Sequence, residues 1–239
     1  MRVAHEAKPS LHRLLPDKYF RWRAGEITRL EAFSDVVFGF AITLLVVSLE
    51  VPHNYTELMQ DMRGFLPFAV CFAQLVLIWY EHYSFSRRYG LEDGRTVLLN
   101  VALLFVVLFY VYPLKFLFTL ILGRIVGLHE TTLTADAEAA SLMRIYAIGW
   151  TAVFALFTLL YWHAYSLRKG LELNEVETYA TRTAIQRNLG NLAVGIVSFA
   201  FSYVSPAWAG WSYFLVGIFS WIHGTVSGNR MRRMAERLG

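Results

Sequence analysis

The stretch Arg29-Leu-Glu-Ala-Phe-Ser-Asp35 runs without a break into the apolar segment Val36–Leu49. An arginine and a carboxylate at the mouth of a helix long enough to cross a membrane cost free energy, because charge is poorly solvated at that depth. Polar groups from elsewhere in the chain must therefore compensate them. We expect that compensation to lie close to the functional part of the protein.

The composition indicates a membrane protein. Hydrophobic residues make up 56% of the 239 residues and charged residues 17%, and the mean hydropathy is +0.42. A soluble domain would carry about a quarter of charged residues. Six stretches reach the roughly 20 apolar residues that a helix needs to cross a bilayer. They are Glu31–Val51, Gly64–Phe85, Thr96–Phe116, Ser141–Ser166, Ala184–Val204 and Trp208–Gly224. The sequence thus predicts an all-α integral membrane protein with six transmembrane helices.

The basic residues are divided unevenly between the two sides of the predicted membrane. Of the 22 Lys and Arg residues, all but Arg63, Lys115, Arg124 and Arg144 fall in segments that share one side. Cytoplasmic loops are enriched in Lys and Arg, so both termini are predicted to be cytoplasmic. The chain then divides into a basic N-terminal arm (1–28), a six-helix transmembrane subunit (29–226) and a basic tail (227–239). We expect it in the cell membrane, as a multi-pass protein of a bacterial inner membrane. The arm is either a lipid-binding segment or a segment without structure.

The residue content disfavours several classes of function. The pI near 9.2 follows from the topology and from contact with anionic lipids, so no nucleic-acid partner is expected. Cys71 is the single cysteine and lies in the second span, which excludes an intrachain disulfide and a cysteine-cluster metal site and predicts a packing role. His163 and His223 stand alone near span ends, as packing or interfacial residues do. With no accompanying nucleophile or metal-ligand set, we expect neither an enzyme nor a cofactor.

Three spans carry polar groups at a similar depth near the cytoplasmic side. Asp35 opens the first span, His82 lies near the end of the second, and Asn100 opens the third. At about 1.5 Å per residue, all three lie on the order of 6–9 Å below the cytoplasmic surface. Polar groups inside a membrane must satisfy one another, so we predict that these three and Ser34 form one hydrogen-bonded cluster. The alternative is that each side chain reaches the headgroups separately, and this fits Glu81 better because it lies next to the interface.

A helical projection of the first span separates two faces. Stepping about 100° per residue places one stripe along Arg29, Phe33, Val36, Phe40, Thr43, Leu44 and Val47, with Asp35, Ile42 and Leu49 on the opposite side. Asp35 is therefore predicted to face the second and third helices. Apart from Arg29 and Thr43 the stripe is apolar, and it could be a packing face, a lipid face or, repeated around a symmetry axis, a hydrophobic constriction that gates by dewetting.

Several short motifs together indicate a family. Arg29, Phe33, Ser34 and Asp35 form an Arg-x-x-x-Phe-Ser-Asp motif, and Thr43 follows eight residues after the aspartate. Trp79-Tyr-Glu-His82, Leu98-Leu-Asn100 and Tyr112-Pro113 follow in the second and third spans. In these motifs the chain resembles the prokaryotic branch of the transmembrane protein 175 family of potassium channels. The resemblance covers the first three spans by motif and the last three by count and hydropathy.

The resemblance implies a homotetramer in which the first helix of each subunit lines a central pore. In this family, rings of side chains on that helix are held to give selectivity, and the narrowest ring is usually isoleucine or leucine. Phe40 stands at that position here, and Leu44 and Val47 stand at further apolar ring positions. With Thr43, these are residues of the projected stripe. Phe40 is bulkier than the usual residue and so bears on conductance and ion preference. The resemblance also implies that a structural polar network holds the first three helices together, formed by Arg29, Ser34, Asp35, His82 and Asn100.

Three hypotheses about function follow. The first is passive conduction of monovalent cations, with a preference for potassium as the permeant ion, through a homotetramer embedded in membrane lipids. The second is a proton-coupled secondary transporter that uses Asp35 and His82 as a relay; this class usually shows inverted repeats or broken helices, and no repeat is visible. The third is a membrane enzyme or a structural scaffold, which a stable monomer would favour.

Overall fold

A computed structural model describes residues 20–47, 53–126 and 136–238 of the chain. All regular secondary structure in these residues is helical. The helices are α1 (Arg29–Val47), α2 (Tyr55–Arg63), α3 (Phe65–Tyr89), α4 (Gly94–Val126), α5 (Asp136–Ser166), α6 (Glu175–Phe201), α7 (Pro206–Trp211) and α8 (Phe214–Leu238). The prediction of an all-α protein is thus confirmed for the described residues.

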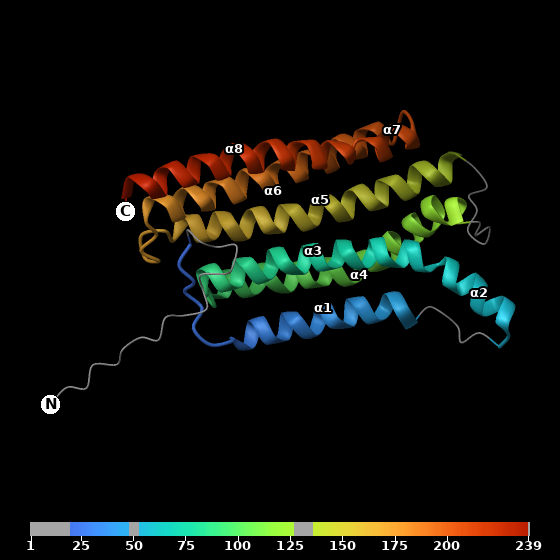
Figure 1. The fold of residues 1–239 in the computed structure, drawn as a ribbon, viewed down its shortest axis with the longest axis horizontal. Helices are drawn as coiled ribbons and strands as arrows, with labels where there is room; N and C mark the ends of the chain where they lie inside the picture. The colour runs from blue at the N-terminus through green and yellow to red at the C-terminus, as the bar shows by residue number, and fades with distance from the viewer. Residues whose placement is uncertain (1–19, 48–52, 127–135, 239) are drawn as a thin grey trace.

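The long helices run side by side along the bundle (Figure 1). The start of α1 lies at the same end as the last turns of α3, α5 and α8, while the short helices α2 and α7 lie at the other end. α1 packs against α3 and α4, and α5 packs against α4 on one side and α6 on the other. The bundle therefore has a first half (α1, α3 and α4) and a second half (α5 to α8) that meet chiefly where α4 contacts α5.

Three of the described helices are long and apolar enough to cross a membrane by length and composition. They are Phe65–Tyr89, Gly94–Gly123 and Ala137–Ser166, in α3, α4 and α5. They coincide with the second, third and fourth predicted spans. The remaining predicted spans overlap α1, α6 and α7 with α8.

Several helix ends differ from the predicted spans. α6 starts at Glu175, ahead of Ala184, because the Asn174 side chain accepts a hydrogen bond from the Glu177 backbone N–H and the Glu177 side chain accepts one from Asn174 in return. The sixth predicted span is split into α7 and α8 at Ser212. α8 continues through the predicted tail to Leu238, so the described part of that tail is helical.

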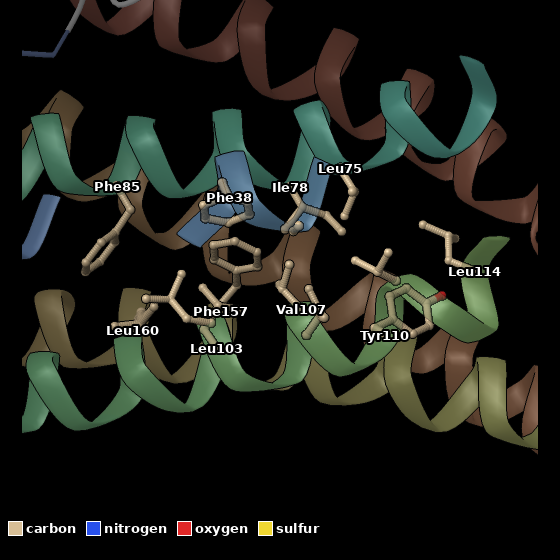
Figure 2. Packing of buried hydrophobic residues seen from close by; sticks show 14 of the residues in the cluster. Phe38, Leu75, Ile78, Phe85, Leu103, Val107, Tyr110, Leu114, Phe157 and Leu160 are labelled. Carbon is tan, nitrogen blue, oxygen red and sulfur yellow. The ribbon is translucent and has the colours of Figure 1, made fainter. Parts of the chain in front are cut away.

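The core lies where the two halves meet. Buried side chains from α1, α3, α4 and α5 come together there, among them Phe38, Ile78, Val107 and Phe157 (Figure 2). Cys71 is fully buried in the same core, as its predicted packing role requires.

The contact between α4 and α5 depends on a glycine. A Cβ atom added at Gly149 would lie 2.2 Å from the Tyr110 ring, closer than any real contact allows. The missing side chain lets the Tyr110 ring lie directly against the α5 backbone.

Candidate functional site

α1 has one buried face and one exposed face within a single subunit. The buried face packs on α3 and α4, and its residues are Glu31, Ser34, Val37, Phe38, Ala41 and Leu45. Their spacing of three and four residues is that of one side of an α-helix. This face fixes α1 to the rest of the first half.

The exposed face contains part of the stripe that the helical projection predicts, together with Asp35 and Val46, which the projection placed off the stripe. Phe33, Val36 and Phe40 are each more than half exposed, and Thr43 is exposed one turn further on. The Thr43 hydroxyl donates a hydrogen bond to the Gly39 carbonyl at 2.9 Å. Leu44 differs from the other stripe residues because it is half-buried and packs against the core. The Val47 side chain lies outside the described residues.

A buried polar chain joins α1, α4 and α3 near the cytoplasmic end that the sequence predicts. The Asn100 Nδ2 donates to Ser34 Oγ at 2.8 Å, and Asn100 Oδ1 lies 2.6 Å from His82 Nε2. Ser34 Oγ in turn donates to the Leu30 carbonyl at 2.7 Å. All three side chains are buried. The structure thus brings Ser34, His82 and Asn100, three of the four residues of the predicted cluster, into contact.

Asp35 and Arg29 are not part of this buried polar chain of side chains, contrary to the prediction. Asp35 Oδ1 accepts a hydrogen bond from Trp79 Nε1 at 2.8 Å and lies at the exposed edge of the α1–α3 contact. Neighbouring positions on a helix point about 100° apart, so Ser34 and Asp35 cannot face the same partners. Arg29 is exposed and makes no hydrogen bond or ion pair with any residue that the structure describes. His82 bonds to Asn100, so no direct Asp35–His82 relay is formed.

Glu81 forms an ion pair across the two halves of the bundle. The prediction that Glu81 reaches the headgroups on its own was wrong, because Arg187 Nη2 on α6 lies 2.5 Å from both of its carboxylate oxygens. Asn188 Nδ2 adds a longer hydrogen bond at 3.3 Å. This pair bridges α3 and α6.

The residues just before α1 form a short connection that we call the N-terminal strap, residues 20–25. The backbone N–H groups of Arg23 and Ala24 donate to the Arg87 carbonyl at the end of α3, at 3.2 and 3.3 Å. Gly90 caps α3 with φ at 57°, and a Cβ there would lie 3.2 Å from the Ala24 nitrogen. Only a glycine suits both the positive φ and the close approach. The strap therefore lies tightly against the end of α3.

The strap is also bonded to the second half of the bundle. Arg23 donates to both carboxylate oxygens of Glu177 at 2.7 and 3.1 Å, and its Nε donates to the Leu171 carbonyl at 2.7 Å. Burial by itself would raise the pKa of the Glu177 carboxyl, but hydrogen bonds from Arg23 and from the backbone N–H groups of Arg21 and Asn174 outweigh it and hold that pKa below its ordinary value. Of the predicted arm, Met1 to Tyr19 lie outside the described residues.

Two more contacts position helix ends. Lys115 Nζ on α4 donates to the Leu45 carbonyl on α1 at 3.0 Å, so an ammonium group caps the outer part of α1. At the opposite end, His163 Nε2 lies 2.9 Å from Asp93 Oδ2 and ties α5 to the turn before α4. Burial acts to raise the pKa of Asp93, yet hydrogen bonds from Thr96 and His163 hold it below its ordinary value. His163 is thus bonded and not isolated, while His223 stacks on the Phe219 ring.

The described residues offer little for metal or acid–base chemistry. No group of three or more His, Cys, Asp and Glu side chains among them lies close enough to hold a metal ion. The most distinctive site in the described part of the chain is therefore the exposed face of α1 together with the polar chain behind it.

Comparison with known proteins identifies relatives of the chain. A family model described as the endosomal/lysosomal potassium channel TMEM175 matches residues 29–110, which contain α1, α3 and most of the described first half. A curated potassium channel of Marivirga tractuosa is 40% identical over 233 residues, covering 91% of this chain and 94% of the relative. A potassium channel of Chamaesiphon minutus is 27% identical over 188 residues, covering 75% of this chain and 86% of the relative.

Two solved structures resemble the bundle along most of its length. One is a crystal structure of a threonine-to-alanine variant of the potassium channel MtTMEM175 in complex with a nanobody–MBP fusion protein; its TM-score is 0.78 at 38% identity, covering 89% of this chain and 98% of that one. The other is a crystal structure of a lysosomal potassium-selective channel TMEM175 homolog from Chamaesiphon minutus. Its TM-score is 0.55 at 26% identity, covering 83% of this chain and 96% of that one.

Proposed function

Because this chain belongs to the TMEM175 family of potassium channels, we propose that it conducts monovalent cations passively, with potassium preferred, through a homotetrameric pore lined by α1. The subunit is the transmembrane unit 29–226, and the pore residues are Phe40, Thr43, Leu44 and Val47. Potassium is the permeant species, and the protein needs no cofactor and is not an enzyme.

The observation that carries this proposal is the exposed face of α1. Phe33, Val36 and Phe40 leave more than half of their surfaces uncovered in one subunit, although the opposite face of the same helix is buried. Large exposed apolar patches mark contact with lipid or with other subunits. Four copies of this face around an axis would form a hydrophobic constriction at Phe40, which opens and closes to water and ions by wetting and dewetting.

The buried face supports the same arrangement. A pore helix must keep its orientation while ions pass, and the hydrogen bonds of Ser34 to Asn100 and of Asn100 to His82 fix the rotation of α1. In this proposal Ser34, His82 and Asn100 are structural, Asp35 braces α1 through Trp79, and Arg29 stands at the pore mouth.

We further propose six transmembrane segments with both termini in the cytoplasm of a bacterial cell. The uneven distribution of Lys and Arg supports this orientation. The described ends support it as well, since the start of α1 and the end of α8 lie at one end of the bundle (Figure 1). The segments are α1, α3, α4, α5, α6 and α7 with α8, and the protein would lie in the inner membrane.

Ion flux in liposomes tests the proposal. We expect purified protein to give a potassium flux above the sodium flux, and we expect Phe40→Ala to raise the flux by widening the constriction. Thr43→Ala should change the ratio of potassium to sodium. Ile148→Ala is the control, because Ile148 is exposed on α5 and not on α1.

Three outcomes would overturn the proposal. Unchanged flux after substitution at both Phe40 and Thr43 would remove the pore assignment. Flux that saturates and requires a proton gradient would instead indicate a transporter, and a monomer in native mass spectrometry would exclude the tetrameric pore.

A further inference from the structure

A cavity of about 210 Å³ lies over α5, lined by α3 on one side and by α6 and α8 on the other. We call it the α3–α6 cavity. The side chains of α5 that line it are all aromatic: Trp150, Phe154 and Phe157. Leu77 of α3 also lines it and is 69% exposed. The cavity therefore reaches the outer surface of the bundle, between helices that are long and apolar enough to cross a membrane.

The amide side chains that line the cavity direct several of their polar atoms into the protein. Gln74 Nε2 donates to the Tyr146 hydroxyl at 3.3 Å. Asn188 Nδ2 donates to Glu81 at 3.3 Å. The Oδ1 atoms of Asn188 and Asn191 are buried, so they are closed to a molecule in the cavity. Away from its charged residues, the cavity thus presents mainly carbon, and this favours an apolar occupant.

The charged residues that line the cavity, Glu81 and Arg187, form the ion pair between α3 and α6. Arg187 Nη2 lies 2.5 Å from both carboxylate oxygens of Glu81. The other guanidinium nitrogens, Nε and Nη1, donate to no residue that the structure describes. The side chain of Arg187 is 39% exposed, against 17% for that of Glu81. Because an arginine presents its N–H groups in a fork that matches phosphate oxygens, Arg187 can bind a phosphate without losing Glu81.

The apolar part of the cavity lies deeper in the bundle than the ion pair. Leu77 and Gln74 precede Glu81 by about one and two turns of α3, which ends at the proposed cytoplasmic end. Asn191 follows Arg187 by about one turn of α6, which begins at that end (Figure 1). A phospholipid of the cytoplasmic leaflet has the same order, with its phosphate at the surface and its acyl chains toward the middle of the membrane.

The charges at this end of the cavity favour an anion. Arg88 of α3 lies close enough to Arg187 to act on it electrostatically, so two arginines stand against the one carboxylate of Glu81. The cytoplasmic leaflet is the one that carries anionic lipids, and basic pockets between transmembrane helices bind their headgroups.

We propose that the α3–α6 cavity binds an anionic phospholipid of the cytoplasmic leaflet, with its phosphate on Arg187 and part of one acyl chain against Trp150, Phe154 and Phe157. An apolar cavity of about 150 Å³ holds benzene, so this cavity has room for several methylene groups of a chain. The choice of leaflet rests on the membrane orientation given under Proposed function. The binding itself does not require that α1 lines a pore.

The probe is dioleoyl phosphatidylglycerol, which is anionic, and the control ligand is dioleoyl phosphatidylcholine, which has the same chains and no net charge. Native mass spectrometry of the full-length protein in detergent counts the bound lipids as each one is titrated. We expect one saturable phosphatidylglycerol per subunit, bound about tenfold more tightly than phosphatidylcholine, since hydrogen bonds to charged groups are stronger than neutral ones.

A double variant tests the headgroup contact. Glu81→Gln with Arg187→Gln removes both charges together, so neither is left buried alone and the net charge of the protein is unchanged. The preference for phosphatidylglycerol should fall from about tenfold to near onefold. Because the net charge is kept, general attraction between the protein and anionic lipid cannot cause this loss.

A second variant tests the chain contact. Val216→Trp should fill the cavity and weaken binding of both lipids by about tenfold or more, because Val216 lines the cavity from α8. Leu215→Trp is its matched control, since Leu215 is half exposed on α8 and does not line the cavity.

Three results would overturn the proposal: no saturable binding of phosphatidylglycerol, equal affinity for the two lipids, or a phosphatidylglycerol affinity unchanged in both the double variant and Val216→Trp. If Val216→Trp fails to fold, the double variant with the two lipids still decides. None of these results depends on ion flux, so the failure of this proposal and the failure of the channel proposal are distinguishable.

Discussion

Phe38 and Phe40 stand two residues apart on α1, and they differ more than any other pair of aromatic side chains on that helix. Phe38 is 1% exposed and Phe40 is 63% exposed. The first is enclosed by its own chain, and the second keeps most of its surface uncovered by the residues that the structure describes. The comparison shows that the described part of one subunit covers one face of α1 and leaves the other face open, which is the face that we propose lines the pore.

The largest effect should separate the two phenylalanines directly. Phe38→Ala should lower the free energy of unfolding by about 3–5 kcal/mol, because it leaves a cavity in the core. Phe40→Ala should change it by about 1 kcal/mol or less in the monomer. Thermal unfolding of both variants in detergent measures the difference, and similar losses from the two would show that the faces are not distinct.

The polar part of the buried face should give the next largest effect. Asn100→Leu leaves His82 Nε2 and Ser34 Oγ without their partner and should cost about 1–3 kcal/mol. Val101→Leu is a matched control on the neighbouring, exposed position. A melting temperature equal in the two variants would mean that the polar chain does not help to hold α1.

A pH dependence should show how firmly the start of α1 is held. The Glu177 carboxyl has a folded-state pKa below its ordinary value of 4.5. A group of this kind contributes stability that is present above the ordinary pKa and is lost as the pH falls through the folded pKa. Wild-type protein should therefore be more stable than Glu177→Gln at neutral pH, and the gap should close below pH 4.5. If the difference in stability between wild type and Glu177→Gln does not change with pH, the Arg23–Glu177 ion pair is not its cause.

The smallest effect on stability should come from the exposed face at Thr43. Thr43→Ala and Thr43→Ser should both lie within about 0.5 kcal/mol of wild type. They should differ in flux, because serine keeps the hydroxyl and alanine does not. If serine and alanine give the same potassium-to-sodium ratio, the hydroxyl has no part in ion preference.

Position along each predicted span indicated which polar groups lie at a similar depth in the membrane. That depth was enough to group Ser34, His82 and Asn100, which the structure brings into contact. Depth could not predict which way each side chain points around its helix, because neighbouring positions differ by about 100°. Asp35 was therefore assigned to the wrong partners, although it does face α3 through Trp79. Rotation of one helix against its neighbours depends on packing, which local spacing does not contain.

Ion pairs between residues far apart in the chain could not be predicted from the sequence for a similar reason. Glu81 and Arg187 are 106 positions apart, and nothing local marks them as partners. α2 was also missed, since it is too short for a span. Its apolar residues Tyr55, Leu58, Met59 and Met62 follow a helical spacing, and that signal could have revealed it.

The N-terminal strap has a consequence for how the protein is made. Arg23 bonds to Glu177, which is 154 positions later in the chain. At a synthesis rate of about 5–20 residues per second, the ribosome adds Glu177 some 8–30 s after Arg23. Throughout that time the residues leading into α1 have no permanent attachment to α6. The α1 helix therefore reaches its final anchoring only after most of the subunit has been synthesised.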